Sequence, residues 1–146
     1  ELLKQEIDKL RKIENIDIKI IYPFNFNSPY RKPYFVFKKF MDVIINKQTI
    51  KVGDLNFLRD IIHPKLVVNT SFTCSEDTII GSGVLTNVKS FFTDLLSFYN
   101  LKYEDYVIED LNHLVNIRKP FYYKTDKKYT SLLEDTIYDI ENYKKL

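Results

Sequence analysis

The sequence contains almost no cysteine and no tryptophan: Cys74 is the one thiol in 146 residues. A single cysteine cannot form an intramolecular disulfide and provides no cysteine cluster for a metal, which is typical of a reducing compartment. The sequence also has no signal-peptide pattern and no apolar run near the roughly 18 residues of a membrane span. These absences predict a protein of the cytoplasm or nucleus with no membrane partner. Because the chain begins with Glu1 and not Met, we also expect a domain excised from a longer chain.

Charge of either sign is not concentrated anywhere in the chain. The net charge is +2, and the 22 basic and 20 acidic residues are interleaved. No basic stripe faces a phosphate backbone, so nucleic acid is not an expected partner. With 45% hydrophobic and 29% charged residues, the composition is that of a soluble globular protein. The length predicts one domain spanning residues 1–146, and eleven Tyr and eleven Phe predict an aromatic core.

Helical periodicity is clearest at the two ends and in the middle of the chain. Leu3, Ile7 and Leu10 share one face of an amphipathic opening helix. A second helix is predicted after Thr86 or Asn87, either of which can serve as its N-cap. A third is predicted to follow a cap at Thr125 or Asp126, and a short one near residues 109–116.

Strand signals lie between the first two helices. Residues 16–21 alternate isoleucine with charged residues, which predicts a half-buried strand. Residues 34–45 are rich in aromatic and β-branched side chains and also read as strand, and residues 49–52 as a further short one. We therefore predict an α+β fold, with an N-terminal helix, an antiparallel meander of about four strands and C-terminal helices.

Several short motifs follow one another in the order found in a known family. They are "SPY" with "YFVFKKF" (residues 28–40), "FLRDIIHP" (57–64), "HPKLVVNTSFTC" (63–74), "SGVLT" (82–86) and "YYKTDKKYTSLLEDT" (122–136). In this order and spacing the chain resembles the ubiquitin-conjugating enzymes, as a divergent member. The resemblance implies their helix-sheet-helix fold and their place in the ubiquitin or ubiquitin-like conjugation pathway.

For Cys74 the resemblance implies a catalytic role. A conjugating enzyme, a cysteine transferase, carries ubiquitin or a similar modifier as a thioester and passes it to a lysine, because a thiolate is both a good nucleophile and a good leaving group. The other interpretation is a small, buried and inert cysteine. The resemblance implies no cofactor, and the sequence suggests no metal site.

The sequence departs from the family at the position of its usual active-site asparagine, which is Lys65. Losing an oxyanion donor typically costs about 2.7–4 kcal/mol. A lysine can also donate and would favour an oxyanion, so Lys65 either supports the site or points into solvent beside a decayed one. Asn69 is a candidate substitute donor.

Other positions receive roles only through the resemblance. His63 and Pro64 are expected to be structural parts of the active site, and Asp110 is a candidate acidic gate that orients the incoming lysine. An ordinary exposed acidic pair with Glu109 explains Asp110 as well. The resemblance also places an activating enzyme on the basic face of the first helix, which a solvated face would explain equally.

Three functional hypotheses stay open at this point. The first is an active conjugating enzyme that works through Cys74. The second is an inactive variant that acts as an adaptor, binding ubiquitin, an active conjugating enzyme or a ligase, and Lys65 and the absent tryptophan favour it. The third is an α+β interaction domain with no link to ubiquitin.

Overall fold

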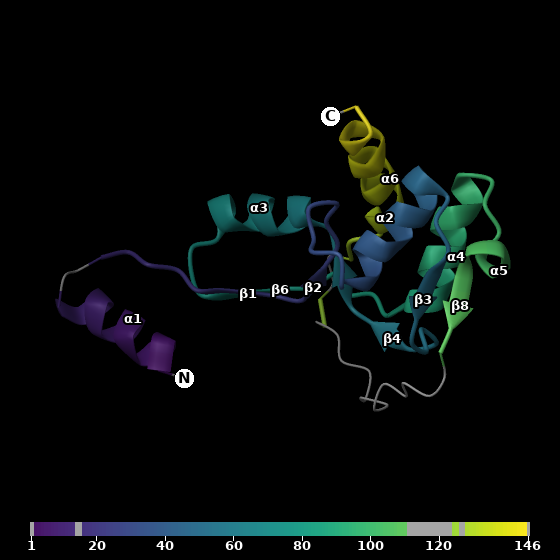
Figure 1. Ribbon diagram of the computed structural model, residues 1–146. Helices are drawn as coiled ribbons and strands as arrows, with labels where there is room; N and C mark the ends of the chain where they lie inside the picture. Colours follow the sequence, from purple (N-terminus) through teal and green to yellow (C-terminus); the bar gives the residue numbers. More distant parts are fainter. Residues whose placement is uncertain (1, 14–15, 111–123, 126–127, 146) are drawn as a thin grey trace.

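Helices make up the largest part of the structure, a computed structural model that describes residues 2–13, 16–110, 124–125 and 128–145 (Figure 1). The helices are α1 (Leu2–Ile13), α2 (Val36–Asn46), α3 (Pro64–Thr73), α4 (Val88–Phe98), α5 (Tyr103–Tyr106) and α6 (Leu132–Tyr143). None of the helices in these ranges is long and apolar enough to cross a membrane. The predicted helix near residues 109–116 falls mostly outside the described residues.

The strands are short and pair mainly in parallel. The parallel pairs are β1 (Ile21–Pro23) with β6 (Thr78–Ile80), β2 (Asn25–Phe26) with β5 (Ile61–Ile62), and β3 (Ile50–Val52) with β8 (Val107–Glu109). The antiparallel pair is β4 (Leu58–Arg59) with β7 (Thr86–Asn87). Parallel neighbours need a crossover connection, and each parallel pair here is joined through helical segments. The predicted antiparallel meander is therefore wrong.

The body of the molecule is built around two helices that pack through aromatic rings. The rings of Phe40 on α2 and Phe92 on α4 are stacked, with centroids 3.9 Å apart and an interplanar angle of 7°. On α2, Phe37, Phe40, Met41 and Ile44 are buried, a spacing of three and four residues that is helical. The prediction of a strand over residues 34–45 is wrong, because this helical stripe outweighs the strand preference of the individual residues.

Some of the predicted local structure is confirmed. α1 forms where the opening helix was predicted, and β3 forms within residues 49–52. Asn87 is the N-cap of α4, and its side-chain oxygen accepts a hydrogen bond from the Ser90 amide at 3.0 Å. Residues 16–20 are not a strand, since β1 begins at Ile21, and the last helix starts at Leu132, later than predicted.

Beside the body lies a narrow arm, formed by β1 and β6 with α3 along it (Figure 1). α1 lies at the far end of this arm, away from the body, and a stretch of chain connects it to β1. We call β1 and β6 together the β1–β6 arm.

A buried carboxylate ties two distant segments together where the arm meets the body. Asp60 is completely buried, and its Oδ1 accepts the backbone N–H of Ser82 at 2.7 Å. The Ser82 hydroxyl lies 2.7 Å from the same oxygen and accepts the N–H of Val84 at 3.0 Å. A buried carboxylate is stable only when such donors surround it. Asp60 therefore fixes the residues before α3 against those before α4.

This contact makes a prediction about stability. Asp60→Ala leaves the Ser82 donors buried without their acceptor, so we expect the free energy of unfolding to fall by about 2–3 kcal/mol. Urea denaturation followed by circular dichroism measures it. Asp94→Ala, at an exposed position of α4, is the control and should change the same quantity by about 0.5 kcal/mol or less. Equal losses in the two variants would contradict the role of Asp60.

Candidate functional site

The residues singled out from the sequence are spread along α3 and do not form a cluster around Cys74. Lys65 lies in the first turn of α3 and Cys74 follows its last residue, which separates them by about 13 Å along the axis. Cys74 is half-buried, and its Sγ lies 3.7 Å from the Ser71 carbonyl oxygen. Asn69 is exposed in the middle of the helix. Residues 64–73 form helix α3, where no helix was predicted from the sequence.

Asp110 lies elsewhere, at the end of β8. Its backbone N–H donates to the Val52 carbonyl at 2.7 Å, and it lines a surface hollow of about 250 Å³ with Lys39 and Lys51. This hollow contains none of the residues of α3, so the structure does not bring Asp110 and Cys74 into one described site.

His63 joins the start of α3 to α6 through both of its ring nitrogens. Nδ1 accepts the backbone N–H of Lys65 at 3.2 Å, and Nε2 lies 2.8 Å from the Asp139 carboxylate. Because Nδ1 is an acceptor, Nε2 carries the proton and donates to Asp139. Pro64 occupies the first turn of the helix, where its missing N–H and fixed φ suit the start of a helix. In this arrangement neither ring nitrogen is directed at a cavity.

A second link between α3 and α6 lies beside the first and involves Asp135. Its carboxylate accepts from the Tyr129 hydroxyl at 2.6 Å and from Lys65 Nζ at 3.0 Å. Partial burial would by itself raise the pKa of Asp135, but these two hydrogen bonds and the positive charge hold it below its usual 3.8. The Lys65 side chain is thus engaged by α6 at the surface.

The lowered pKa gives a prediction about pH. A depressed carboxyl pKa contributes stability that is complete above pH 3.8 and is lost as the pH falls through the lower folded value. Tyr129→Phe removes one of the hydrogen bonds to the ionised Asp135. We expect it to lower the free energy of unfolding by about 1–2 kcal/mol at pH 6.

In urea titrations, this difference should shrink as the pH falls below 3.8. Tyr138→Phe is the matched control, because Tyr138 is 68% exposed on α6, the helix that carries Asp135. A Tyr129→Phe effect that stays constant down to pH 2 would contradict this account of Asp135.

A glycine pair after β6 has the position of a phosphate-binding loop but not its geometry. Gly81 and Gly83 follow a strand of a parallel pair, as in the dinucleotide motif G-x-G-x-x-G, but the third glycine position is Thr86. The chain has three glycines in all, and the other is Gly53. The N–H of Ser82, between the pair, donates to the buried Asp60 carboxylate. This loop does not match the dinucleotide motif, because its third glycine position is Thr86, the N–H of Ser82 is taken and the Asp60 carboxylate lies beside it.

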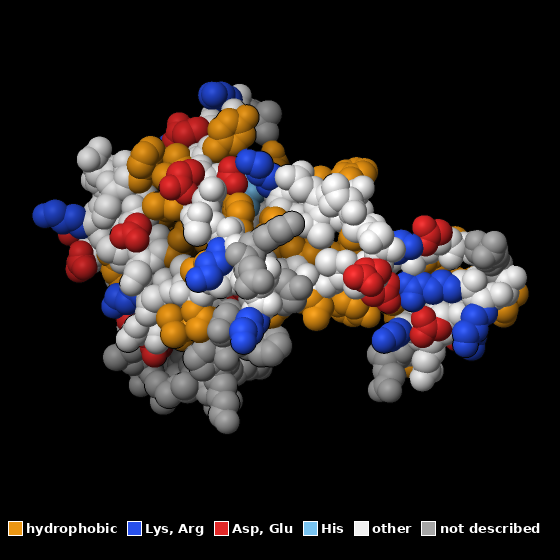
Figure 2. Space-filling model, turned by 180° about the vertical axis from the view of Figure 1, so that it is seen from behind, with side chains coloured by type: hydrophobic (Ala, Val, Ile, Leu, Met, Phe, Trp, Pro, Cys, Tyr) orange, Lys and Arg blue, Asp and Glu red, His pale blue; other side chains and the backbone are white. Residues whose placement is uncertain are grey.

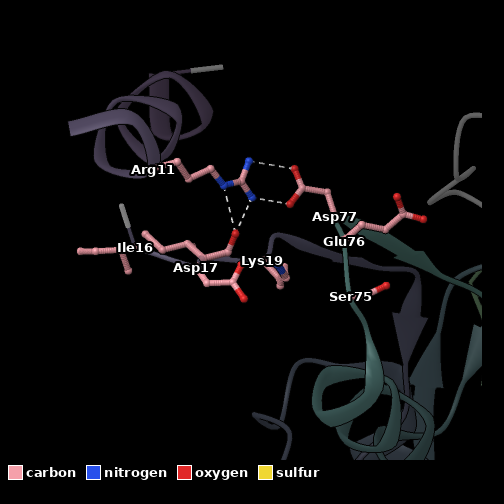
Figure 3. Close-up of a pocket in the computed structure, with 8 residues that line it drawn as sticks. Arg11, Ile16, Asp17, Lys19, Ser75, Glu76 and Asp77 are labelled. Atoms are coloured by element: carbon pink, nitrogen blue, oxygen red, sulfur yellow. Dashed lines mark hydrogen bonds and ion pairs between the residues drawn. The ribbon is translucent and has the colours of Figure 1, made fainter. Parts of the chain in front are cut away.

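A cavity of about 710 Å³ opens between α1 and the start of the arm, and the Arg11 guanidinium that lines it is bonded to other groups around it (Figure 3). The Arg11 guanidinium donates to the Ile18 carbonyl, to Asp8 and to both carboxylate oxygens of Asp77. These contacts hold the pKa of Asp77 below its usual value. The arrangement is a joint between α1 and the arm, with its cation already neutralised.

A smaller pocket of about 250 Å³ on the body has a different chemistry, and we call it the arginine pocket. Two guanidinium groups, those of Arg31 and Arg59, line it together with an amide, that of Asn27. The rest of the wall is mainly apolar, and its aromatic members are Phe26, Phe35, Phe37, Phe57 and Phe92. The lining residues come from β2, β4, β5, α2 and α4 and from the loops beside them, which are brought together only by the fold.

Each guanidinium in the arginine pocket is held against aromatic rings. The Cζ of Arg31 lies 4.4 Å from the ring centroids of both Phe26 and Phe35, and its Nη2 donates to the Phe26 carbonyl at 3.0 Å. The Cζ of Arg59 lies 4.6 Å from the centroid of Phe57. Among the ion pairs between described residues, neither arginine has a carboxylate partner. Both cations are therefore preorganised and keep donors for an anion.

Asn27 also lines the arginine pocket, but its side-chain nitrogen is sealed from solvent. The residue is 8% exposed, and its Nδ2 has no hydrogen-bond partner among the described residues. Two cations and flat apolar walls suit a ligand with an anionic group attached to a ring.

Sequence reasoning missed these three residues. A signal was present for Arg59, because Arg59 and Asp60 interrupt an otherwise apolar run from Phe57 to Ile62. Two adjacent charges in a run that is otherwise buried need partners, and alternation along a strand sends them in opposite directions.

Comparison with known proteins gives a fold and no family. No protein-family model matches the chain, and no curated protein is significantly similar. Among solved structures, a UDP-glucose 4-epimerase of Thermotoga maritima with UDP-glucose is 17% identical, with a TM-score of 0.72 over 97% of this chain and 50% of its own. RMD of Pseudomonas aeruginosa with NADPH is 16% identical, with a TM-score of 0.71 over 92% of this chain and 51% of its own.

A third similar structure is that of a dehydratase. DesIV, a dTDP-glucose 4,6-dehydratase of Streptomyces venezuelae with NAD and TYD bound, is 16% identical, with a TM-score of 0.68 over 94% of this chain and 47% of its own. The chain spans about half the length of these structures. It has the Rossmann-like fold of NAD(P)-dependent epimerases and dehydratases, with parallel strand pairs.

These findings correct the resemblance drawn from the sequence. The chain does not have the ubiquitin-conjugating fold, so the conjugating function, the cysteine transferase class and the modifier, activating-enzyme and ligase partners are not supported. The inactive adaptor loses its basis with them. The shared motifs are short, and serine-proline or histidine-proline pairs occur wherever a turn or a helix start is needed. Their order alone was not evidence of the fold.

Proposed function

We propose that this chain is the sugar-nucleotide-binding part of an epimerase- or dehydratase-type enzyme, and that a nucleoside diphosphate sugar binds in the arginine pocket. The observation that carries the proposal is the pair of guanidinium groups, Arg31 and Arg59, held against aromatic rings in one pocket with no carboxylate partner among the described ion pairs. The similarity to structures that hold UDP-glucose or TYD supports it.

The chemistry of the arginine pocket matches such a ligand part by part. A diphosphate carries the charge that Arg31 and Arg59 would neutralise, and guanidinium groups bind phosphate oxygens with two parallel hydrogen bonds. The phenylalanine walls offer flat apolar surface to a base or a sugar face.

NAD(P) is not part of this proposal for residues 1–146. In the Gly81–Gly83 loop the N–H of Ser82 already donates to Asp60, and the remaining glycine, Gly53, is remote in sequence. We therefore expect the chain alone to bind a sugar nucleotide and not a dinucleotide.

The test is calorimetric titration of the purified chain with UDP-glucose, dTDP-glucose and NADPH. We expect binding of at least one sugar nucleotide and none of NADPH. Arg59→Ala and Arg31→Ala should each weaken sugar-nucleotide binding by about tenfold or more, since a hydrogen bond to a charged group is worth about 1.5–3 kcal/mol.

Lys51→Ala is the control, because Lys51 is an exposed cation on β3 outside the arginine pocket, and it should leave affinity unchanged. Asn27→Asp places a negative charge beside the diphosphate and should abolish binding. Sugar-nucleotide binding that is unaffected by both arginine variants, or tight binding of NADPH, would contradict the proposal.

A further inference from the structure

α3 begins at a cap that can change its charge. His63 is the N-cap, and its ring Nδ1 accepts the backbone N–H of Lys65 at 3.2 Å. The side chains of Ser, Thr and Asn accept such a hydrogen bond at any ordinary pH, whereas an imidazole accepts it only while Nδ1 is unprotonated. Histidine is the side chain that ordinarily changes its charge between pH 5 and 8. The cap of α3 therefore depends on the protonation of one ring.

Little else holds α3 in helical form. The helix has 10 residues, and none of them is buried. A helix of this length is marginal by itself in water and normally depends on packing of an apolar face. On α3, Val68 and Phe72 are 52% and 86% exposed, and Figure 2 shows hydrophobic side chains exposed between the body and α1. The loss of a cap therefore matters more to α3 than to α4, whose apolar face is packed in the core.

Protonation of His63 acts in opposite directions on the two helices that it joins. It turns Nδ1 from an acceptor into a donor that faces the N–H of Lys65, and it places a positive charge at the N-terminal end of a helix dipole. The imidazolium keeps a partner, because Nε2 lies 2.8 Å from the Asp139 carboxylate on α6. A charged ring thus holds α3 less well and α6 more strongly.

The other charged groups at this corner do not change in the same pH range. Asp135 and Asp139 face the ring from α6, and Lys65 Nζ on α3 is bonded to Asp135 at 3.0 Å. Tyr129, before α6, donates to the same Asp135 carboxylate. β5 and the strand β2 paired with it contain no charged residue. Side chains of Asp, Lys and Tyr ordinarily titrate outside pH 5–8, so His63 is the group among these described residues that can switch there.

We propose that His63 is a pH-dependent cap, which releases the first turn of α3 when its ring is protonated. The neutral imidazole caps α3 and joins it to α6. The imidazolium pairs with Asp139, and α3, which lies along the β1–β6 arm, opens from its N-terminal end (Figure 1). The proposal does not depend on ligand binding in the arginine pocket.

Amide hydrogen exchange of the purified chain between pH 5 and 8, followed by NMR and corrected for the intrinsic pH dependence of exchange, tests the proposal. We expect protection at Lys65 and along α3 to fall about fivefold as the His63 ring becomes protonated in the same samples, which is the effect of a lost cap. The chain has two histidines, and His113→Gln leaves one ring signal to follow. The amide of Ser90, capped by Asn87, is the internal control and should keep its protection throughout.

Two substitutions hold the cap in one state each. His63→Asn keeps an acceptor for the Lys65 N–H at every pH, so protection of α3 should stay high and lose its pH dependence. His63→Gln keeps a donor for Asp139 but is not a good cap, so protection should stay low across the range.

Four results would overturn the proposal. They are a His63 ring that keeps one charge state between pH 5 and 8, protection of α3 that does not follow the ring, an equal loss at Ser90, and a pH-dependent loss that persists in His63→Asn. The titration of the unsubstituted ring decides the matter if either His63 variant fails to fold. None of these results affects the calorimetric test of the arginine pocket, so the two proposals fail separately.

Discussion

The buried hydrogen bonds between Asp60 and Ser82 are the constraint on which the other features depend. Asp60 is buried between β4 and β5, and its neighbour Arg59, the last residue of β4, lines the arginine pocket. The same carboxylate accepts the N–H of Ser82 in the Gly81–Gly83 loop, and its position there leaves the loop unsuited to phosphate. The buried Asp60 thus lies beside an arginine of the arginine pocket and also makes the Gly81–Gly83 loop unsuited to phosphate.

The molecule divides its tasks between two regions. The body has a continuous apolar core centred on α2 and α4, and the arginine pocket is set into its wall between these helices and the short strands. The arm and α1 bury little and are joined through an ion pair at Arg11 and Asp77. The body is therefore the part that holds the core, and the arm is the part that buries little.

The sequence predicted structure where local signals were strong and failed where tertiary contacts decided. Asn87 was found because a cap acts within three residues, and α1 because its apolar spacing is regular. α3 was not predicted, since none of its residues is buried and it has no clear apolar face. Strands of two or three residues are too short for alternation to show, so the parallel pairing could not be foreseen.

The candidate site could not be assembled from the sequence either. Asn27, Arg31 and Arg59 meet only because β2 pairs with β5, which brings residues 25–26 beside residues 61–62. The catalytic role expected for Cys74 came only from a resemblance to a family. The described residues of α3 do not form a cluster of donors around its thiol. Rarity of a residue type was a weaker guide than a pair of charges in an apolar run.

The most direct test of the central claim is an experimental structure of the chain crystallised with UDP-glucose. The account predicts the diphosphate within hydrogen-bond distance of both arginines in the pocket. A nucleotide located at Gly81–Gly83, or anywhere that leaves the guanidinium groups of Arg31 and Arg59 free, would contradict it.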